Sequence, residues 1–424
     1  MASLHLLLRN EIIAQHKFQQ NKYAELQTKK LCIDLTRGKP SPKQLDLSNI
    51  LLKLPNSCFL DQNKFDTRNY GGLSGLLELR KIFAKLLNIP AQNLIAGNNA
   101  SLELMHDIVS FSMLYGNIDS FRPWVKENII KFLCPTPGYD RHFSMLESFG
   151  IEMISIPNDE NGPHINLIEK LIKTDRNIKG MWCVPQYSNP SGITYSWNTI
   201  KRLIQMDAAA EDFRLIWDNA YVIHTLTNNF IKPTNILNLA KAANNPNRPL
   251  IFTSTSKVTF PGSGISFFGS SLDNIRWYIR HASKKSIGPD KINQLRHSLF
   301  LNSTANVKLQ MERHLKIITP KFASIVKILR NRLDSYDIVS WNTPKGGYFI
   351  SFDVWPGTAK RIVKYAKKAG IILNESGSAF PYHNDPDDKN IRIAPTFSEL
   401  LDINEAIDGL VTCTLLATIE FLLQ

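Results

Sequence analysis

Short, unbroken apolar runs recur between residues 129 and 268 and alternate with segments of helical periodicity. Because these runs are continuous rather than alternating, we expect strands that are buried on both faces. The strands are predicted at Ile129–Cys134, Ile151–Ile156, Gly180–Val184, Leu215–Trp217, Leu250–Thr253 and Ile265–Phe268, with helices at His142–Phe149, Leu167–Lys173, Trp197–Ala208 and Thr234–Ala243. The pattern predicts an α/β fold with a mostly parallel sheet covered by helices.

The flanking regions have different patterns. Helices are predicted over residues 1–30 and at Gly75–Leu87 and Leu102–Tyr115. Beyond residue 290, helical periodicity extends to about Tyr336 and is followed by short strands at Gly347–Phe352, Gly370–Leu373 and Asn390–Ala394, with helices at Ala359–Lys368 and Ser398–Leu423. We therefore expect a large domain over residues 49–300, a smaller α+β domain over 301–424, and an N-terminal segment, 1–48, that packs with the small domain.

The composition is that of a globular protein, with 424 residues, 43% hydrophobic and 21% charged. No apolar run reaches the ~18 residues of a membrane span. The first residues, MASLHLLLRNEII, lack a leading basic region and a cleavage site, so we expect a helix rather than a signal peptide. Five scattered cysteines without CxxC spacing argue against disulfides and a metal site, and they favour a cytoplasmic location.

The net charge of +13 is compatible with a nucleic acid or an anionic membrane as partner. However, the basic residues are spread along the chain, with only mild crowding between Arg276 and His297, and no nucleic-acid-binding signature accompanies them. We favour a solvated basic face that attracts acidic small molecules, and we expect neither nucleic acid nor membrane as a partner.

Polar residues follow the predicted strands at the edge where such sheets bind ligands. Successive strands lead to PTPGY, which ends at Tyr139, to a turn containing Asn189, to DNAY, which runs from Asp218 to Tyr221, and to TSTSK, which ends at Lys257. Each could be structural, and a surface lysine at a strand end is the commoner case. Their arrival in series instead favours a site, in which a buried lysine could form a Schiff base with a carbonyl.

Three further features allow two interpretations each. The loop that ends at Asn99, Ala100 and Ser101 precedes a helix, so it is either a plain N-cap or an anion site. Gly38 is either an ordinary turn residue or a place where a ligand approaches the backbone. Arg392, between two isoleucines, either faces solvent or clamps a carboxylate.

The order of these motifs, with Tyr70-Gly before them and Gly346-Gly347-Tyr348 and Arg392 after them, resembles class I aminotransferases from about Asp34 to the C-terminus. These are fold type I enzymes dependent on pyridoxal 5′-phosphate (PLP), with a seven-stranded type of sheet. The stretches DLTRGKPSP, PTPGYDRHF, TSTSKVTFPGSGISFF and GGYFISFD resemble more narrowly the aspartate aminotransferases called type Ic.

The resemblance implies a role for each residue. Lys257 would hold PLP as an internal aldimine and then transfer the proton, while Asp218 would pair with the pyridinium nitrogen. The remaining implied contacts are Tyr221 and Asn189 with the 3′-oxygen, Tyr139 with the ring face, Asn99, Ala100, Ser101 and Ser254 with the phosphate, Tyr70 with the phosphate of the neighbouring subunit, and Arg392, Gly38 and Asn189 with the substrate carboxylate. A homodimer with shared active sites follows from the place of Tyr70.

One position departs from the family pattern. Most class I members carry a phosphate-binding arginine eight residues after the lysine, where this chain has Ile265. Lys39, Arg37 and Lys284 are candidate substitutes, and the group that would bind a dicarboxylate side chain is not identified.

The implied reaction is aspartate:2-oxoglutarate transamination by a ping-pong mechanism. Two alternatives keep the same cofactor: transamination with another amino donor, and β-elimination. A PLP-binding transcription regulator is a third, disfavoured because only about 30 residues precede Asp34.

Overall fold

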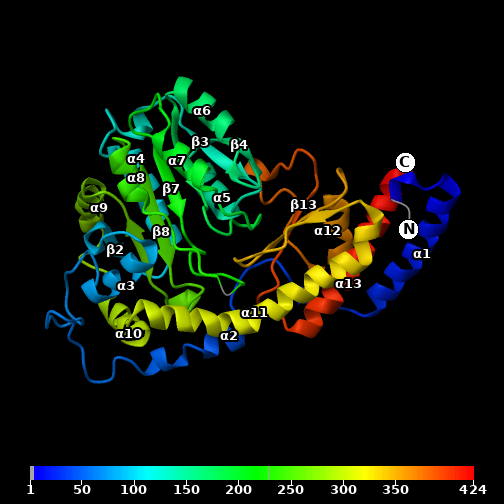
Figure 1. Cartoon of the computed structure of the whole chain (residues 1–424), viewed down its shortest axis with the longest axis horizontal. Helices are drawn as coiled ribbons and strands as arrows, with labels where there is room; N and C mark the ends of the chain where they lie inside the picture. Colours follow the sequence, from blue (N-terminus) through cyan, green and yellow to red (C-terminus); the bar gives the residue numbers. More distant parts are fainter. Residues whose placement is uncertain (1–3, 228) are drawn as a thin grey trace.

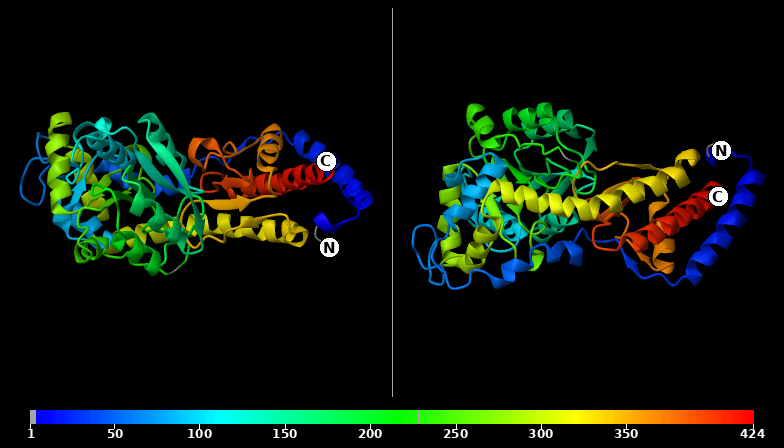
Figure 2. Two further views of the ribbon diagram at one scale, coloured as in Figure 1. Left: turned by 90° about the horizontal axis from the view of Figure 1, so that it is seen from above. Right: turned by 60° about the horizontal axis from the view of Figure 1, so that its bottom comes forward.

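The computed structural model of the protein describes residues 4–227 and 229–424. These residues form an elongated molecule with a large lobe built on a sheet and a smaller, more helical lobe (Figure 1). Helix α11 (Thr304–Leu333) runs from one lobe into the other, and α1 (Arg9–Thr28) lies beside α13 (Leu400–Leu422) at the far end of the small lobe (Figure 2).

Within the described residues, the large lobe holds an eight-stranded sheet. The strand order is β2 (Leu94–Ala96), β9 (Ser266–Gly269), β8 (Pro249–Ser254), β7 (Arg214–Asp218), β6 (Ile178–Cys183), β3 (Lys131–Thr136), β4 (Glu152–Asp159) and β5 (Gly162–Pro163). From β8 to β4 all neighbours are parallel, whereas β9 is antiparallel to both of its neighbours and the two-residue edge strand β5 is antiparallel to β4. The predicted mostly parallel sheet is confirmed.

Helices cover both faces of this sheet, because successive strand side chains point to opposite faces. Phe267 belongs to one apolar core and Phe268 to the other. The first core lies under α3 (Leu77–Leu87), α6 (Ile165–Thr174), α7 (Trp197–Gln205), α8 (Ile236–Ala242) and α10 (Lys291–Leu301), and the second lies under α4 (Ser101–Tyr115), α5 (Asp140–Ser148) and α9 (Leu272–Lys285).

The predicted helix Trp197–Ala208 ends early, at Gln205. The carbonyl oxygens of Ile204 and Met206 accept hydrogen bonds from Nη1 of Arg248 at 2.8 and 2.6 Å. A guanidinium group therefore takes up carbonyls that a continuing helix would have bonded internally.

The small lobe combines two short sheets with long helices. Strands β10 (Ser340–Trp341), β11 (Ile350–Asp353) and β13 (Asn390–Ile393) form an antiparallel sheet, and β1 (Ile33–Asp34) pairs with β12 (Ile371–Ile372) in parallel. With α11, α13, α12 (Ala359–Lys368) and α1 they enclose a core to which Leu4, Ile12 and Leu26 contribute.

The division at residue 300 stays a proposal. It falls near the end of α10, and the helix that follows it, α11, belongs to both lobes. Val307 and Met311 pack in the large-lobe core, while Ile318 and Phe322 pack in the small-lobe core.

The chain reverses its order in the sheet between β3 and β6, because β4 lies on one side of β3 and β6 on the other. The carboxyl ends of strands near such a reversal are where α/β sheets bind ligands. Backbone hydrogen bonds from Gly138 N to Ala379 O and from Gly347 N to His224 O, both 2.8 Å, join these ends to the small lobe.

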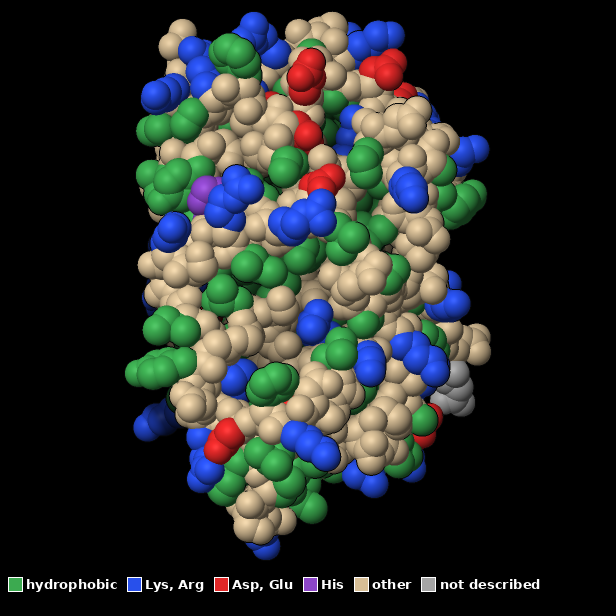
Figure 3. Space-filling view, turned by 90° about the vertical axis from the view of Figure 1, so that its left-hand side faces the viewer, with side chains coloured by type: hydrophobic (Ala, Val, Ile, Leu, Met, Phe, Trp, Pro, Cys, Tyr) green, Lys and Arg blue, Asp and Glu red, His purple; other side chains and the backbone are tan. Residues whose placement is uncertain are grey.

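No helix in the described ranges is long and apolar enough to cross a membrane. On the end face of the large lobe, Lys and Arg side chains are spread among neutral ones rather than gathered in one patch (Figure 3).

Candidate active site

Lys257 lies just after β8 with its amine enclosed by protein, although part of the side chain remains accessible. Its Nζ is 5.0 Å from the ring centroid of Tyr221 and 5.9 Å from that of Tyr348. It makes no hydrogen bond or ion pair with any described residue. Burial lowers the pKa of Lys257, and the charge of Asp218 only partly opposes this. The result is an amine prepared to act as a nucleophile.

Asp218 is 5% exposed at the end of β7. Its Oδ1 accepts a hydrogen bond from Ala220 N (3.0 Å), and its Oδ2 lies 3.1 Å from Nε2 of His142. The His142 ring stacks on Trp182, with centroids 4.0 Å apart. Sequence reasoning missed His142; its place three residues after Tyr139, in the first turn of α5, was the available signal.

Two phenols lie beside this carboxylate. Burial raises the pKa of Tyr139 to about 12, and its ring meets His142 edge-on at 4.9 Å. Burial, helped by Tyr139 and Asp218, raises the pKa of Tyr221 well above its ordinary value. Both side chains are therefore neutral at physiological pH and can donate hydrogen bonds.

Arg392 faces the space between the lobes and is 7% exposed. Strand alternation places Ile391 and Ile393 in the small-lobe core and the arginine on the opposite face. Its Nη1 lies 3.2 Å from Asp140 Oδ1 and 3.4 Å from Asn189 Oδ1, and its Nη2 lies 3.2 Å from the carbonyl oxygen of Thr36. Of the two predicted orientations, the structure has the one away from solvent, toward Asp140 and Asn189 of the large lobe.

Neighbouring residues fix the position of this guanidinium group. Its Cζ lies 4.8 Å from the centre of the Phe349 ring. A Cβ on Gly38 would come within 2.6 Å of that ring, so glycine lets the N-terminal segment lie against it. With its amide oriented as its neighbours require, Asn374 places its oxygen 3.3 Å from Arg392 Nε. Asn374 and Asp140 carried no pattern from which sequence reasoning could find them.

The end of β8 meets the start of helix α4. The N-cap Ala100 is extended and has no side chain to cap the helix, so no side chain takes up the first N–H groups, and Glu103 N donates to Ala100 O at 3.2 Å. Ser266, the partner of Ser254 across the sheet, donates its N–H to Asn98 O (2.6 Å) and thereby holds this loop beside β8. An uncapped helix terminus next to serine hydroxyls suits a phosphate group.

None of the cations suggested by the sequence reaches that terminus. Ile265 is buried in the core, and its N–H donates to Thr255 Oγ1. Lys39 lies over the Phe397 ring, 3.9 Å from its centre, while Arg37 and Lys284 are exposed and form no side-chain hydrogen bond or ion pair among the described residues.

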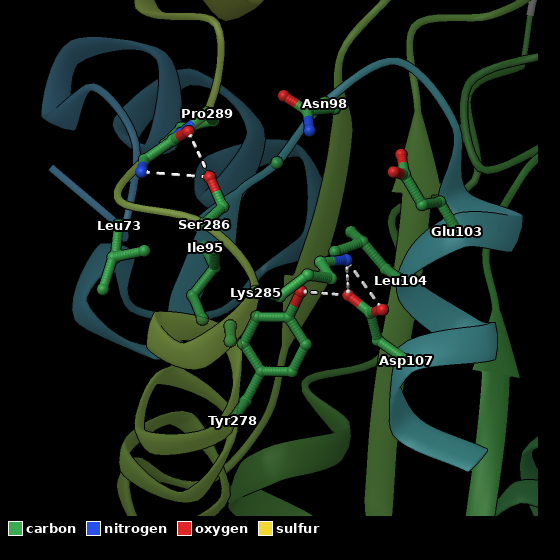
Figure 4. A pocket seen from close by; sticks show the side chains of 13 residues that line it. Leu73, Ile95, Asn98, Glu103, Leu104, Asp107, Tyr278, Lys285, Ser286 and Pro289 are labelled. Carbon is green, nitrogen blue, oxygen red and sulfur yellow. Dashed lines mark hydrogen bonds and ion pairs between the residues drawn. The ribbon is translucent and has the colours of Figure 1, made fainter. Parts of the chain in front are cut away.

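Lys285 lies closer to α4, but its ammonium group is taken up by another partner. It contacts both oxygens of Asp107 at 2.6 and 2.7 Å, and Tyr278 donates to the same carboxylate at 2.9 Å (Figure 4). Among the described residues that line the space beside the α4 terminus there is no lysine or arginine, and two of them, Glu103 and Asp290, are carboxylates. An open cavity of about 330 Å³, lined by Asn99, Ser263, Asp290 and their neighbours, adjoins this terminus.

Tyr70 is far from buried, with 83% of its surface exposed, and its side chain makes no hydrogen bond to the described part of the chain. The structure thus gathers Lys257, Asp218, Tyr221, Tyr139, Asn189 and Arg392 where the two lobes meet and places Asn99, Ala100, Ser101 and Ser254 beside the α4 terminus, but leaves Tyr70 outside this group.

The family model for aspartate amino-transferase matches residues 7–424. The chain is 61% identical over 424 residues to a Mycolicibacterium smegmatis protein named as an aminotransferase without a stated substrate, with 99% of each chain covered. It is 47% identical to an aspartate aminotransferase of Corynebacterium glutamicum, covering 96% of this chain and 94% of that one. The crystal structure of an aspartate transaminase from C. glutamicum superposes with a TM-score of 0.98 at 46% identity, covering 99% of both chains. The protein therefore belongs to the aspartate aminotransferase family and is an aminotransferase.

Proposed function

We propose that the protein is a PLP-dependent aspartate aminotransferase that transfers an amino group from aspartate to 2-oxoglutarate by a ping-pong mechanism. The observation that carries this proposal is the enclosed amine of Lys257, which has no polar partner among the described residues, faces Tyr221 and has a lowered pKa. Asp218 is the charged neighbour of this amine, and Tyr221, over whose ring the amine lies, is in turn close to both Asp218 and Arg392.

The residues present fit the cofactor. Lys257 would bind its carbonyl carbon, Asp218 would keep its ring nitrogen protonated, and Tyr139 would lie against the ring. Tyr221 and Asn189 would hydrogen-bond its 3′-oxygen, and the α4 terminus with Ser254 would hold its phosphate. When bound, PLP supplies the electron sink that makes the α-proton of an amino acid removable.

The protein's own groups then perform two tasks. Arg392, with Asn189 and the Gly38 backbone, would bind the α-carboxylate and orient the α-proton toward Lys257. The Lys257 amine would accept that proton and later donate it again to complete the amino-group transfer. Its lowered pKa permits both steps, because the uncharged amine can act as a base.

We also propose a homodimer with shared active sites, to which the exposed Tyr70 contributes across the interface, and a cytoplasmic location, which the five free cysteines support. Aspartate as the amino donor is supported by the 47% identical aspartate aminotransferase of C. glutamicum.

The test is a panel of amino donors with 2-oxoglutarate, run on the wild type and on Lys257→Ala. We expect aspartate to be the preferred donor and the variant to bind PLP without turnover. Residual activity of Lys257→Ala within tenfold of wild type would contradict the role of Lys257, and release of pyruvate and ammonia in place of keto-acid exchange would point to β-elimination.

A further inference from the structure

Five buried polar side chains surround the peptide that follows Lys257. They are contributed by elements outside the central sheet, and each is at most 3% exposed. The five are Gln44 from α2 (Pro42–Asp46), His224 from the turn after β7, Gln310 and His314 from α11, and Tyr348 just before β11.

Two consecutive carbonyl oxygens receive donors from this group. His314 Nε2 lies 3.1 Å and Gln310 Nε2 3.4 Å from Val258 O. His224 Nε2 lies 3.4 Å from Lys257 O. The backbone on the carboxyl side of the lysine is thus held by side chains from α11 and the β7 turn, because the chain leaves β8 before Lys257 and loses its ladder partners there.

The protons of this group can be assigned from its contacts. A carbonyl only accepts, so His314 carries its hydrogen on Nε2, and its Nδ1 accepts from Gln44 Nε2 at 3.0 Å. The second hydrogen of Gln44 Nε2 reaches the Tyr348 oxygen at 2.9 Å, and Gln44 Oε1 accepts from Ser41 N at 3.1 Å. Both ring nitrogens of His314 are therefore hydrogen-bonded: Nε2 donates to Val258 O, and Nδ1 accepts from Gln44.

The histidines remain uncharged beside the lysine. Burial lowers the pKa of His224 to about 3 and that of His314 to about 4. The titratable groups that face the Lys257 amine are Asp218 and Tyr221 from the β7 end, His224 from the following turn and Tyr348 from the small lobe. Of these, Tyr221, Tyr348 and His224 are uncharged at neutral pH, because burial raises the pKa of both phenols and lowers that of the histidine.

We propose that Gln44, His314 and His224 are positioning residues that hold the Lys257–Val258 peptides so that the lysine amine stays enclosed and aligned for transamination. This inference rests on the proposed function. None of the three touches the reacting atoms; they act through the backbone of the lysine. Gln44 also belongs to the N-terminal segment that supplies Thr36 O to Arg392, so one segment contacts both the carboxylate anchor and the support of the lysine.

The decisive variant is His314→Leu, compared with His314→Gln, whose amide can still donate to Val258 O as Gln310 does. A matched control is Trp124→Phe, which removes a buried hydrogen bond of 2.8 Å to Asp212 in the network around the start of β7. For each we would measure kcat and KM, the thermal midpoint, and the pH at which the visible absorbance band of the bound cofactor changes. In the apoprotein we would measure the pH dependence with which Lys257 reacts with pyridoxal.

Without His314, Val258 O keeps only the longer 3.4 Å contact with Gln310, so the peptide is held less firmly, water reaches the amine, and the charged form of Lys257 becomes easier to form. We expect His314→Leu to lower kcat about tenfold with little change in KM, and to move the pyridoxal midpoint upward by about one pH unit. His314→Gln should restore most of both values, and Trp124→Phe should lower the thermal midpoint without moving either pH midpoint.

Equal pH midpoints in wild type and His314→Leu, with kcat reduced no more than in Trp124→Phe, would overturn the proposal. Should His314→Leu not fold, Gln44→Leu provides the same comparison, because it removes the donor to His314 Nδ1 while leaving α11 intact. An unshifted pyridoxal midpoint in Gln44→Leu would equally overturn the proposal. The pyridoxal measurement needs no transamination, so a failed proposed function would be recognised separately, by a wild type that shows no amino-group exchange.

Discussion

At the proposed carboxylate end of the candidate site, Arg392 contacts Asp140, Asn189 and the Thr36 carbonyl, whereas at the proposed phosphate end the start of α4 adjoins serine hydroxyls and an open cavity. The first end is assembled from both lobes and the N-terminal segment of a single chain. The second end lacks a cation from the described residues.

This difference follows from where each end lies. The carboxylate end lies where the two lobes meet, so side chains from several elements converge and buried charges find partners. The phosphate end is at the margin of the large lobe, beside Asn99 and Asp290. Single substitutions should therefore have large effects at the first end and graded effects at the second, where binding depends on backbone N–H groups and, as we propose, on the partner subunit.

The largest effect is expected for Asp218→Asn. The change keeps the shape but removes the buried negative charge that His142 contacts, so the ring nitrogen of the cofactor would no longer be held protonated. We expect kcat to fall on the order of 10²–10³-fold, by analogy with the loss of one preorganised electrostatic contact. Asp175→Asn, which alters the ion pair with Lys131, is the control, and a loss in Asp218→Asn no greater than in that control would contradict the assignment.

Arg392→Ala comes next. Removing one partner of a buried, hydrogen-bonded charge pair costs about 2–5 kcal/mol, so kcat/KM for aspartate should fall roughly 10²–10³-fold, mainly through KM. Steady-state kinetics with aspartate and 2-oxoglutarate would measure this. The matched control is Arg276→Ala, since Arg276 is exposed and pairs with Asp273; its replacement should change neither kcat nor KM. An unaltered KM in Arg392→Ala would exclude Arg392 as the carboxylate anchor.

A smaller effect is expected for Tyr70→Ala at the phosphate end. If the exposed phenol completes the phosphate site of a second subunit, its removal should weaken cofactor binding roughly tenfold, the size of one or two hydrogen bonds. Mixing Tyr70→Ala with Lys257→Ala chains should restore tight cofactor binding at one site per hybrid dimer, because that site combines an intact lysine with an intact partner tyrosine. Absence of restoration in a verified hybrid would show that Tyr70 acts within its own chain or not at all.

The smallest effect concerns acid stability at the lysine support. The pKa of His314 is lowered from 6.5 to about 4, so between these values the unfolded chain binds more protons and stability falls as pH falls. Between pH 7 and pH 6, protonation of this histidine in the unfolded chain should lower the free energy of unfolding by roughly 0.7 kcal/mol. Urea unfolding midpoints of wild type and His314→Gln would test it, since the variant should lose less stability over this step; parallel pH curves would contradict the assignment.

Much of the architecture was predictable because it depends on local patterns. Continuous apolar runs fixed the strands, and the loops after β3, β6, β7 and β8 contained Tyr139, Asn189, Asp218 and Lys257 in chain order. Since parallel strands present their carboxyl ends at one edge, the order alone implied that these residues lie close together. The resemblance to class I aminotransferases then supplied their roles.

Residues that act from a distance in sequence were not predictable. His142, Asp140 and Asn374 reach the site because α5 and the small lobe pack against the cleft, and Gln44 meets His314 across 270 positions. Such contacts leave no periodic signal, because a single polar residue in a helix looks the same whether it faces solvent or a buried carbonyl.

The amino-acid sequence by itself determined the type of sheet, the series of strand-end residues and the absence of the expected arginine at Ile265. Only the tertiary structure decided that Arg392 points to Asp140 of the large lobe, that Lys285 is held by Asp107, and that the peptide after Lys257 is supported from α11. The reason is physical: strand and turn preferences act between neighbours along the chain, whereas the burial and pairing of charges depend on which distant segments exclude water from them.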